Sequence, residues 1–532
     1  MAGQPDETVT VGVIAFNDFH GHLEAQRSRG SDALTGGAAW LASAIAAMRG
    51  KYDHHATVSA GDLVGASPIA SSMFLDEPAI GAMNRIGLDF NAVGNHEFDR
   101  GTAELLRLQR GGCDKHTHRQ PCRIERFEGA GFDFLAASTL TSDGKTLFPA
   151  TGIRRFGKGA RRVSVGFIGL TLRETSHLVS PDGIAGITFG DEADAIDDAA
   201  KTLNVMGADA IVVLIHQGGR QADGGDDPNG CKDLTGPIVP ILSRLTQHVD
   251  VVVSGHTHQT YVCDLAMGEG KRPLLLTSAG SFGRFVTDIE LKIDPAANRV
   301  VAHKAMNVAV SHGTFEPDGA IAGYVAKYAD AVKDLATRPV GRLSGPASRG
   351  TDGTGGSLGN LIADAQLHAT RSAGAQIALT NPFGIRTDLD SEPDGTVTFG
   401  QIYAVQPFGN TLVTRTLTGS GLRRLLEQGL DDEGPFQPLA PSQGLAYRFD
   451  LSRQAGERIV ALELDGLPIE DKSTFRVTVN SFLAQGGDGF TVLAEGTNEQ
   501  RGGNDLDALE EWIGQKAVRQ VPLEVRVGQK AF

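Results

Sequence analysis

Five apolar, β-branched runs, each ending at a polar or glycine-rich loop, constrain the fold of this chain more than any other feature. The runs are TVTVGVIAF, HHATVSA, FNAV, ADAIVVLI and HVDVVVS, beginning at residues 8, 54, 90, 208 and 248. Short apolar runs bounded by turn residues predict buried strands. Helical patterns such as Gly37–Met48 and Glu192–Met206 lie between them. This alternation predicts an α/β domain whose functional groups gather in the loops that leave the strands.

The chain has 532 residues, enough for two to four domains of about 150 residues each. Near residue 315 the pattern changes to a helical stretch, Pro317–Leu335, and then to a Gly/Ser/Thr-rich segment, Gly345–Gly359, with the composition of a flexible linker. A second mixed α/β pattern follows, with helices expected near 359–372 and 422–430 and strands near 377–379, 411–417 and 476–479. We therefore predict a first domain over 8–316, a connecting helix over 317–337 and a second domain over 338–532.

Composition excludes several classes of protein. The net charge is −15, so the surface repels polyanions and binding of a nucleic-acid polymer is not expected. The sequence has no run of about 18 apolar residues, so no transmembrane helix is expected. The polar start, MAGQPDETVT, carries no leader, so either the protein is cytosolic or a signal peptide has been removed.

The four cysteines favour an oxidising compartment. Cys113 and Cys122 bracket a short polar segment; Cys231 follows an Asp/Gly-rich loop, and Cys263 follows the apolar run that begins at residue 248. An even count with local pairing and no CxxC motif predicts the disulfides Cys113–Cys122 and Cys231–Cys263. Four unpaired thiols are the alternative; a structural zinc site lacks the close ligand pairs that it requires.

The polar residues in the five loops form a pattern of oxygen and imidazole donors. A single histidine after a strand is usually structural, but donors in five successive strand-ending loops are explained together by one site. These residues are Asp18, His20, Asp62, Asn95, His96, His216, His256 and His258.

Carboxylate, amide and imidazole ligands together suit a borderline transition metal such as zinc, manganese, cobalt or iron, and they argue against calcium. The seven candidate ligands, leaving His96 aside, are too many for one tetrahedral ion. They suit two ions that share a bridging carboxylate, the arrangement of phosphate-ester hydrolases. Such a site is positive even though the protein is acidic.

The motifs NDFHGHLE, GDLVGASP, GNHEFD, HQGG and GHTHQ resemble those of the calcineurin-like metallophosphatases, and their order is most similar to the 5′-nucleotidase family. The resemblance implies a four-layer αββα first domain. It assigns Asp18, His20, Asp62 and His258 to one metal and Asp62, Asn95, His216 and His256 to the other.

The same resemblance makes His96 and Asp99 a catalytic dyad, in which Asp99 fixes the tautomer of His96. Asp99 has an alternative interpretation as the N-cap of the helix that begins at GTAELLRL. We assign no role to five other histidines and expect them in surface loops: His22, His54, His55, His116 and His118.

Four later segments, SLGNLIADA, NPFGIRTDL, QPFGNTL and NSFLAQGGDGF, are similar to motifs of the 5′-nucleotidase C-terminal domain, which binds substrate. The resemblance implies that Phe408 and Phe482 sandwich the nucleobase and that Asp488 contacts the ribose hydroxyls. The remaining substrate residues that it implies are Asn381, Arg386, Asn410 and Arg349. Phe383 stands where the family usually has glycine, so it could crowd the backbone beside Arg386. For the two phenylalanines, ordinary core packing is the alternative.

The resulting hypothesis is a secreted, periplasmic or cell-surface 5′-nucleotidase. It would use two divalent ions and in-line attack of a metal-activated hydroxide to release phosphate from nucleoside 5′-monophosphates, with di- and triphosphates as further substrates. The family implies a site in the cleft between the domains and rotation of the second domain, with the connecting helix as the hinge. Alternatives are a 2′,3′-cyclic-nucleotide phosphodiesterase or 3′-nucleotidase, a nucleotide-sugar hydrolase, and a non-catalytic nucleotide-binding surface protein. The oligomeric state is left open.

Overall fold

The computed structural model describes residues 8–27, 33–222, 227–267, 272–432 and 436–529. The chain divides into two compact units, Met1–Ala331 and Val332–Phe532, and the division falls inside helix α8 (Gly319–Ala336). Across the described ranges, no helix combines the length and apolar character needed to cross a membrane.

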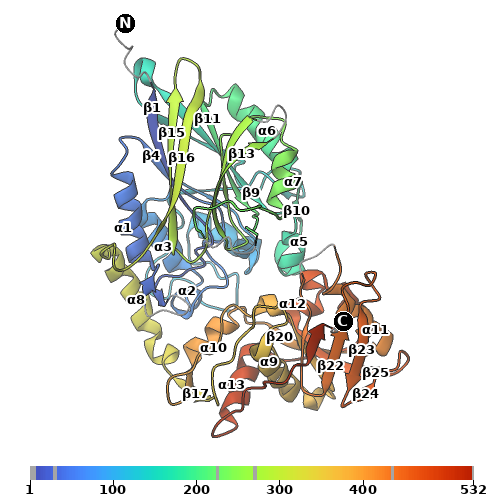
Figure 1. The fold of residues 1–532 in the computed structure, drawn as a ribbon. Coiled ribbons are helices and arrows are strands. Elements are labelled where there is room, and N and C mark those ends of the chain that lie inside the picture. Colours follow the sequence, from blue (N-terminus) through green and yellow to red (C-terminus); the bar gives the residue numbers. More distant parts are fainter. Residues whose placement is uncertain (1–7, 28–32, 223–226, 268–271, 433–435, 530–532) are drawn as a thin grey trace. The chain divides into compact units, whose positions relative to one another are not determined.

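Two six-stranded sheets form the centre of the first unit (Figure 1). The first sheet has the order β16-β15-β1-β4-β5-β6 and the second the order β13-β14-β12-β11-β9-β8. The strands of the first sheet are β1 (Val9–Phe16), β4 (His55–Ser59), β5 (Phe90–Ala92), β6 (Asp133–Leu135), β15 (Phe285–Asp294) and β16 (Arg299–Ala309). Those of the second are β8 (Thr151–Phe156), β9 (Val163–Thr171), β11 (Ala210–His216), β12 (Val251–Ser254), β13 (Thr260–Met267) and β14 (Arg272–Ala279).

The sheets pack face to face, and helices cover their outer faces. Val58 and Phe90 of the first sheet share a buried cluster with Phe167 and Val212 of the second. A second cluster joins α6 (Glu192–Val205) and α7 (Ile238–Ser243) to the second sheet, while α1 (Ala38–Arg49) and α3 (Glu77–Ile86) lie on the side of the first (Figure 1). This is the predicted αββα order.

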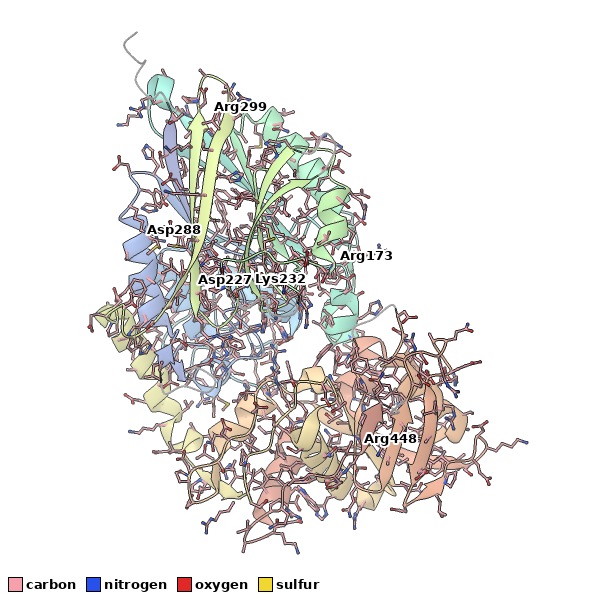
Figure 2. The ribbon with its side chains drawn as sticks, in the orientation of Figure 1. Arg173, Asp227, Lys232, Asp288, Arg299 and Arg448 are labelled. Atoms are coloured by element: carbon pink, nitrogen blue, oxygen red, sulfur yellow. A yellow bond between two sulfur atoms is a disulfide. The ribbon has the colours of Figure 1, made fainter. Side chains whose placement is uncertain are left out.

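The chain just after α1 is tied to the first sheet through Asp288 on β15 (Figure 2). Nζ of Lys51 and Oη of Tyr52 each donate to this carboxylate at 2.8 Å. The outer helix layer is therefore fixed to the sheet by polar contacts as well as by apolar packing.

The predicted strands are present, and their directions determine where the polar loops lie. β1 pairs in parallel with β4, and β4 with β5; β9, β11, β12 and β14 are likewise parallel. The carboxyl ends of parallel strands meet at one edge of a sheet. The loops after β1, β4 and β5 therefore lie together, as do the loops after β11 and β12.

The second unit contains a five-stranded sheet, β21-β18-β25-β20-β26, and a four-stranded sheet, β24-β23-β22-β27, with β17 and β19 paired separately. Its strands are β17 (Pro339–Arg342), β18 (Ile377–Thr380), β19 (Thr396–Thr398), β20 (Thr411–Thr418), β21 (Ala440–Pro441), β22 (Leu445–Phe449), β23 (Ile459–Leu464), β24 (Leu467–Pro468), β25 (Thr474–Asn480), β26 (Thr497–Asn504) and β27 (Val527–Gln529). Its main helices are α9 (Gly356–Ala369), α10 (Phe399–Val405), α11 (Gly419–Gln428), α12 (Ser481–Ala484) and α13 (Asp505–Gly514).

A separate apolar core stabilises this unit, with Leu422 and Leu426 of α11 against Val477 of β25 and Tyr447 of β22. Arg448 on β22 donates to the carbonyl oxygen of Val525 at 3.2 Å and so joins this strand to the segment before β27 (Figure 2).

The linker interpretation of Gly345–Gly359 is wrong. Ala347 in this segment is fully buried and forms a bridge to Leu389, and α9 begins at Gly356. The glycines there allow tight turns inside the second unit, which composition alone does not distinguish from a flexible linker.

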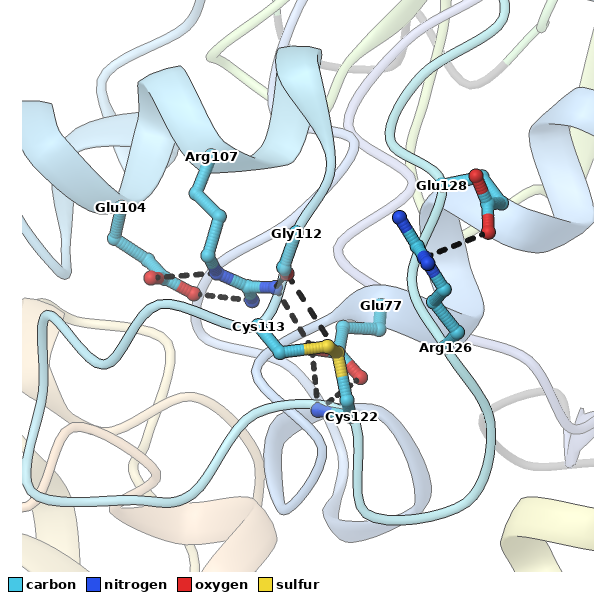
Figure 3. The surroundings of a disulfide bond; sticks show 8 residues. All are labelled: Glu77, Glu104, Arg107, Gly112, Cys113, Cys122, Arg126 and Glu128. Carbon is cyan, nitrogen blue, oxygen red and sulfur yellow. Dashed lines mark hydrogen bonds and ion pairs between the residues drawn. A yellow bond between two sulfur atoms is a disulfide. The ribbon is translucent and has the colours of Figure 1, made fainter.

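Both predicted disulfides are confirmed. Cys113 bonds to Cys122 in the segment after α4 (Thr102–Arg110) (Figure 3), and Cys231 bonds to Cys263 on β13. The peptide N–H of Cys122 donates to both carboxylate oxygens of Glu77, at 3.0 and 3.1 Å, which ties the first bridge to α3.

Candidate functional site

The loops after five strands of the first unit bring the candidate ligands together. Carboxylate oxygens and imidazole nitrogens lie within 4.8 Å of one another in three overlapping groups: Asp18, His20 and His258; His20, Asp62 and His96; Asp18, Asp62 and His216. Asp18, His20, Asp62 and His216 are buried. The groups share members, so they form one cluster.

The backbone at this cluster is unusual. Five of the candidate ligands have φ between 48° and 68°, the left-handed region: Asp18, His20, Asp62, His256 and His258. Non-glycine residues adopt this conformation rarely, and such residues concentrate at functional sites. These left-handed turns direct carboxylate and imidazole side chains from three loops into one cluster.

The ligand atoms of the cluster lie close to one another. Nε2 of His20 lies 3.2 Å from Nε2 of His258, which lies 3.3 Å from Oδ1 of Asp18. Nε2 of His216 lies 2.9 Å from Oδ2 of Asp62 but without hydrogen-bond geometry, so this buried nitrogen has no hydrogen-bond partner among the described residues. Oδ1 of Asn95 is also buried without a partner there. Buried donor atoms that converge in this way fit divalent metal ions.

The tautomers of two histidines are suited to metal binding. Nδ1 of His20 lies 2.9 Å from the carbonyl oxygen of Gly65, and Nδ1 of His216 lies 2.8 Å from that of Ala60. A carbonyl can only accept, so each Nδ1 carries the proton and each Nε2 presents its lone pair to the cluster. Metal-ligating histidines in proteins are oriented in the same way.

Charge in the cluster is strongly coupled. Burial alone would lower the pKa of His216, but the carboxylates of Asp62 and Asp18 raise it to about 10. Burial and the positive charge of His216 lower the pKa of His256 to about 3. The two imidazoles lie side by side, with ring centroids 5.3 Å apart, so the carboxylates and burial act on the pKa values of neighbouring rings in opposite directions.

His96 and Asp99 form a close pair beside the cluster. Nδ1 of His96 lies 2.8 Å from Oδ2 of Asp99, and the same oxygen accepts from the peptide N–H of Ala66 at 3.1 Å. The N-cap of α4 is Gly101, so the N-cap interpretation of Asp99 is wrong.

Two residues at the site carried no assignment from the sequence. Glu97, between the members of the dyad, is buried and accepts hydrogen bonds from three peptide N–H groups. The sequence signal that could have identified Glu97 as a site residue is its position inside the motif GNHEFD. Phe282, with φ 65°, has its ring centroid 5.8 Å from that of His20 and 5.3 Å from that of His258.

His22 was expected in a surface loop, and this expectation is wrong. It is 8% exposed, its ring centroid lies 4.0 Å from that of Phe282, and its Nδ1 contacts the side-chain nitrogen of Gln26. His55, His116 and His118 are exposed as expected, and His54 is half-buried.

In the second unit, two of the segments that resemble substrate motifs meet, NPFGIRTDL and NSFLAQGGDGF. Nδ2 of Asn381 donates to Oδ2 of Asp488 at 2.7 Å, and Nδ2 of Asn480 donates to Oδ1 of Asn381 at 3.1 Å. Asp488 has φ 55°, a further left-handed residue. The half-buried ring of Phe482 packs so closely on Gly487 that an added Cβ would lie 2.5 Å from it.

The segment with Phe408 lies at the same end of the sheet. Leu412 of β20 pairs with Asn480 of β25, and Oδ1 of Asn410 accepts from Oγ of Ser481 at 3.1 Å. The side chain of Phe408 is 37% exposed, unlike a core phenylalanine.

Arg349 and Arg386 occupy neighbouring positions. Nη1 of Arg349 donates to the carbonyl oxygen of Ile385 at 3.1 Å, so Arg349 supports the backbone beside Arg386. Phe383 is 43% exposed, so its side chain is largely outside the packed segment.

Comparison with known proteins agrees with both groups of motifs. Residues 12–260 match the calcineurin-like phosphoesterase family, and residues 335–495 match the 5′-nucleotidase C-terminal domain. The 5′-nucleotidase of Bos taurus is 25% identical over 97% of this chain and 90% of its own length. The 5′-nucleotidase precursor of Thermus thermophilus has a TM-score of 0.81 at 27% identity, over 98% of this chain and 99% of that one.

The endonuclease YhcR of Bacillus subtilis (strain 168) is 30% identical over 96% of this chain, but the chain spans only 40% of its length. Both domain matches occur in the order that the motifs indicate, and the matched structure extends over nearly the whole chain. The chain therefore belongs to the 5′-nucleotidase family, with a calcineurin-like phosphoesterase domain followed by a 5′-nucleotidase C-terminal domain.

Proposed function

We propose that this protein is a two-metal 5′-nucleotidase that releases phosphate from nucleoside 5′-monophosphates, and also from di- and triphosphates. The observation that carries the proposal is the convergence of metal-ligating atoms in the first unit, above all the two Nε2 atoms of His20 and His258 at 3.2 Å. Family membership supports phosphoester hydrolysis over other uses of a metal site.

In this proposal Asp18, His20, Asp62 and His258 hold one divalent ion, and Asp62, Asn95, His216 and His256 hold the other. When bound, two such ions supply positive charge for the phosphoryl oxygens and lower the pKa of water toward neutrality. The ligand set accepts zinc, manganese, cobalt or iron, so occupancy follows supply.

His96 acts on the leaving-group side. Its Nδ1 is engaged by Asp99, so Nε2 is the nitrogen that contacts the phosphoryl group or the leaving oxygen. The carboxylate of Asp99 stabilises the imidazolium and holds the ring in one orientation, which favours charge stabilisation at that oxygen.

The second unit supplies recognition of the nucleoside. Phe408 and Phe482 stack on the base, and Asp488, held by Asn381, accepts from the ribose hydroxyls. Arg386 interacts with the phosphate end of the nucleotide. Arg349 contributes mainly by holding the backbone of residue 385. Asn410 supports the segment that carries Phe408 through its bond with Ser481.

A substrate panel tests the proposal. AMP, ADP, UDP-glucose and 2′,3′-cyclic AMP are incubated in excess Mn²⁺, and both inorganic phosphate and the nucleotide products are identified by chromatography. A DNA oligonucleotide is added because the Bacillus relative is named an endonuclease. We expect AMP to be hydrolysed and the oligonucleotide not. Turnover of cyclic AMP or UDP-glucose without AMP would select one of the alternative phosphoester specificities.

The variant His96→Ala separates catalysis from binding. We expect it to bind as much Mn²⁺ as the wild type while kcat falls by about 10²–10³-fold, the range for loss of one group that stabilises charge in the transition state. If both proteins bind metal and neither hydrolyses any phosphoester, the chain is a nucleotide-binding surface protein instead.

The two disulfides favour an extracellular, periplasmic or cell-surface location. Cell fractionation with labelling of free thiols tests this, because a cytosolic location would keep all four cysteines reduced. Bridged cysteines in an exported fraction are the expected result.

A further inference from the structure

We propose that Glu97 is a positioning residue that fixes the loop of the bridging carboxylate Asp62 against the loop of Asn95. The inference rests on the proposed metal centre and concerns how this chain builds it. Glu97 belongs to none of the candidate ligand groups found in the described part of the chain, so its contacts require another explanation.

The contacts of Glu97 join two separate loops. Oε2 accepts from the peptide N–H of Asp62 at 3.0 Å and from that of Gly94 at 2.7 Å, and Oε1 accepts from the peptide N–H of Leu63 at 2.8 Å. Asp62 and Leu63 follow β4, whereas Gly94 follows β5. One carboxylate therefore ties together the carboxyl ends of two neighbouring parallel strands.

The carboxylate of Glu97 is buried, so it depends on its hydrogen-bond donors. Glu97 is 2% exposed, and within the described residues it forms no ion pair with Lys or Arg. Burial of a carboxylate is expensive unless donors satisfy its oxygens. Here three of the donors are peptide N–H groups, which cannot move without moving the loops; Nδ2 of Asn91 on β5 also donates to Oε1, at 3.4 Å.

The left-handed backbone of Asp62 explains why such a tie is needed. Asp62 has φ 51° and follows Gly61 with φ 90°, so its peptide N–H turns inward to Glu97. Its side chain turns the other way: Oδ1 accepts from the N–H of His96 at 2.9 Å, and Oδ2 lies 2.9 Å from Nε2 of His216. Glu97 stabilises the backbone conformation that aims this carboxylate into the cluster.

The test uses Glu97→Gln, with Glu427→Gln as the matched control. Glu427 in the second unit is 6% exposed and accepts from the peptide N–H groups of Arg458 and Ile459, at 3.1 and 2.6 Å. Both substitutions replace one oxygen of a buried carboxylate by a nitrogen that cannot accept. Mn²⁺ binding to metal-free protein is measured by calorimetry, the visible spectrum of the Co²⁺ protein is recorded, and thermal unfolding is followed in EDTA.

We expect Glu97→Gln to weaken Mn²⁺ binding by about 10–100-fold, the range for supporting groups around metal ligands, and to alter the Co²⁺ spectrum. Glu427→Gln should change neither, even where it lowers the melting temperature in EDTA as much. Wild-type Mn²⁺ affinity and Co²⁺ spectrum in Glu97→Gln, or an equal loss of affinity in Glu427→Gln, would overturn the inference.

Glu97→Asp provides a second variant in case the first does not fold. Its carboxylate is one methylene shorter and cannot reach both loops, so the same loss of affinity is expected. If neither variant folds while Glu427→Gln does, Glu97 supports the whole fold and the inference fails. A wild type that binds Mn²⁺ but hydrolyses no nucleotide would contradict the proposed function alone.

Discussion

At the scale of single residues, the site depends on close packing between backbone turns. Gly61 and Gly94 lie where the loops after β4 and β5 touch: a Cβ on Gly61 would lie 2.7 Å from Nδ1 of His216, and one on Gly94 would overlap Oδ1 of Asp62. The candidate ligands can approach one another because no side chain separates these loops.

Gly94→Ala is therefore expected to displace Asp62. Divalent-metal affinity, measured by calorimetry, should fall by about 10-fold or more, and overpacking should lower the free energy of unfolding by about 1–3 kcal/mol. Gly323→Ala in α8 is the control, because nothing lies within 4 Å of its added Cβ. Unchanged affinity in Gly94→Ala would contradict this account of the loops.

Asp505, at the start of α13, gives a pH-dependent prediction. Burial raises its pKa to about 7 although the N–H of Leu506 donates to it, whereas an unfolded aspartate has a pKa near ~3.9. The native state then binds more protons between about pH 4 and 7, so this group's contribution to stability falls as pH rises through that window.

Asp505→Asn should remove this dependence, so the variant gains stability relative to the wild type as pH rises from 5 to 8. We expect a gain of at least about 1 kcal/mol at pH 8, since one pKa unit is worth about 1.4 kcal/mol, in urea unfolding at both pH values. Asp507→Asn, at an exposed position of the same helix, should change the profile only slightly, because Asp507 is the smallest of the causes that raise the pKa of Asp505. The same gain at pH 5 and pH 8 would show that ionisation of Asp505 is not its cause.

At the scale of elements, polar interactions join the helices of the first unit to the disulfide segment. Arg107 of α4 is 4% exposed; it donates to both carboxylate oxygens of Glu104, at 3.0 and 2.6 Å, and to Glu77 of α3 at 2.8 Å (Figure 3). Glu77 also accepts from Cys122. One guanidinium thus compensates two buried carboxylates that anchor two helices and the bridge.

Arg107→Gln should lower the free energy of unfolding by about 3–5 kcal/mol, because it leaves two buried charges without their cation. Arg126→Gln is the control within the same region: its ion pair with Glu128 joins side chains that are 81% and 77% exposed (Figure 3), and such pairs contribute at most about 1 kcal/mol. Chemical denaturation of oxidised protein measures both. Equal losses would mean that burial does not determine the strength of these pairs.

The elements were predictable wherever one local pattern was enough. β-branched runs predicted β1, β4, β11 and β12, and the parallel order then placed the donors of their loops at shared edges. The burial of His22 depends on Phe282, some 260 positions away, and the role of Glu97 depends on N–H groups of a loop more than 30 positions earlier.

Composition could not separate an ordered turn from a linker at Gly345–Gly359, because glycine occurs in both. Rotation of the second domain about the connecting helix stays a prediction.

At the scale of the whole molecule, each unit has its own apolar core, centred on Phe90 and Phe167 in the first and on Leu422 and Tyr447 in the second. Units with separate cores can unfold in separate steps. The proposed ligands of the metals all lie in the first unit, and the proposed nucleoside residues all lie in the second.

Scanning calorimetry should therefore resolve two transitions that respond to different ligands. Mn²⁺ at 100 times its Kd should stabilise the first unit by about 2.7 kcal/mol and raise only its transition, and EDTA should reverse the shift. Adenosine should raise only the other transition. A single transition, or equal shifts with Mn²⁺, would contradict this division of roles.

The left-handed turns at the candidate ligands also limit which amino acids can replace these residues during evolution. Among residues other than glycine, asparagine, aspartate and histidine enter that region most readily, whereas β-branched residues are outliers there. At Asp18, His20, Asp62, His256 and His258 the residues that the backbone tolerates are thus largely those that can bind a metal. Mutations that would fill these positions with valine or isoleucine are opposed by the fold itself, before any loss of activity is exposed to selection.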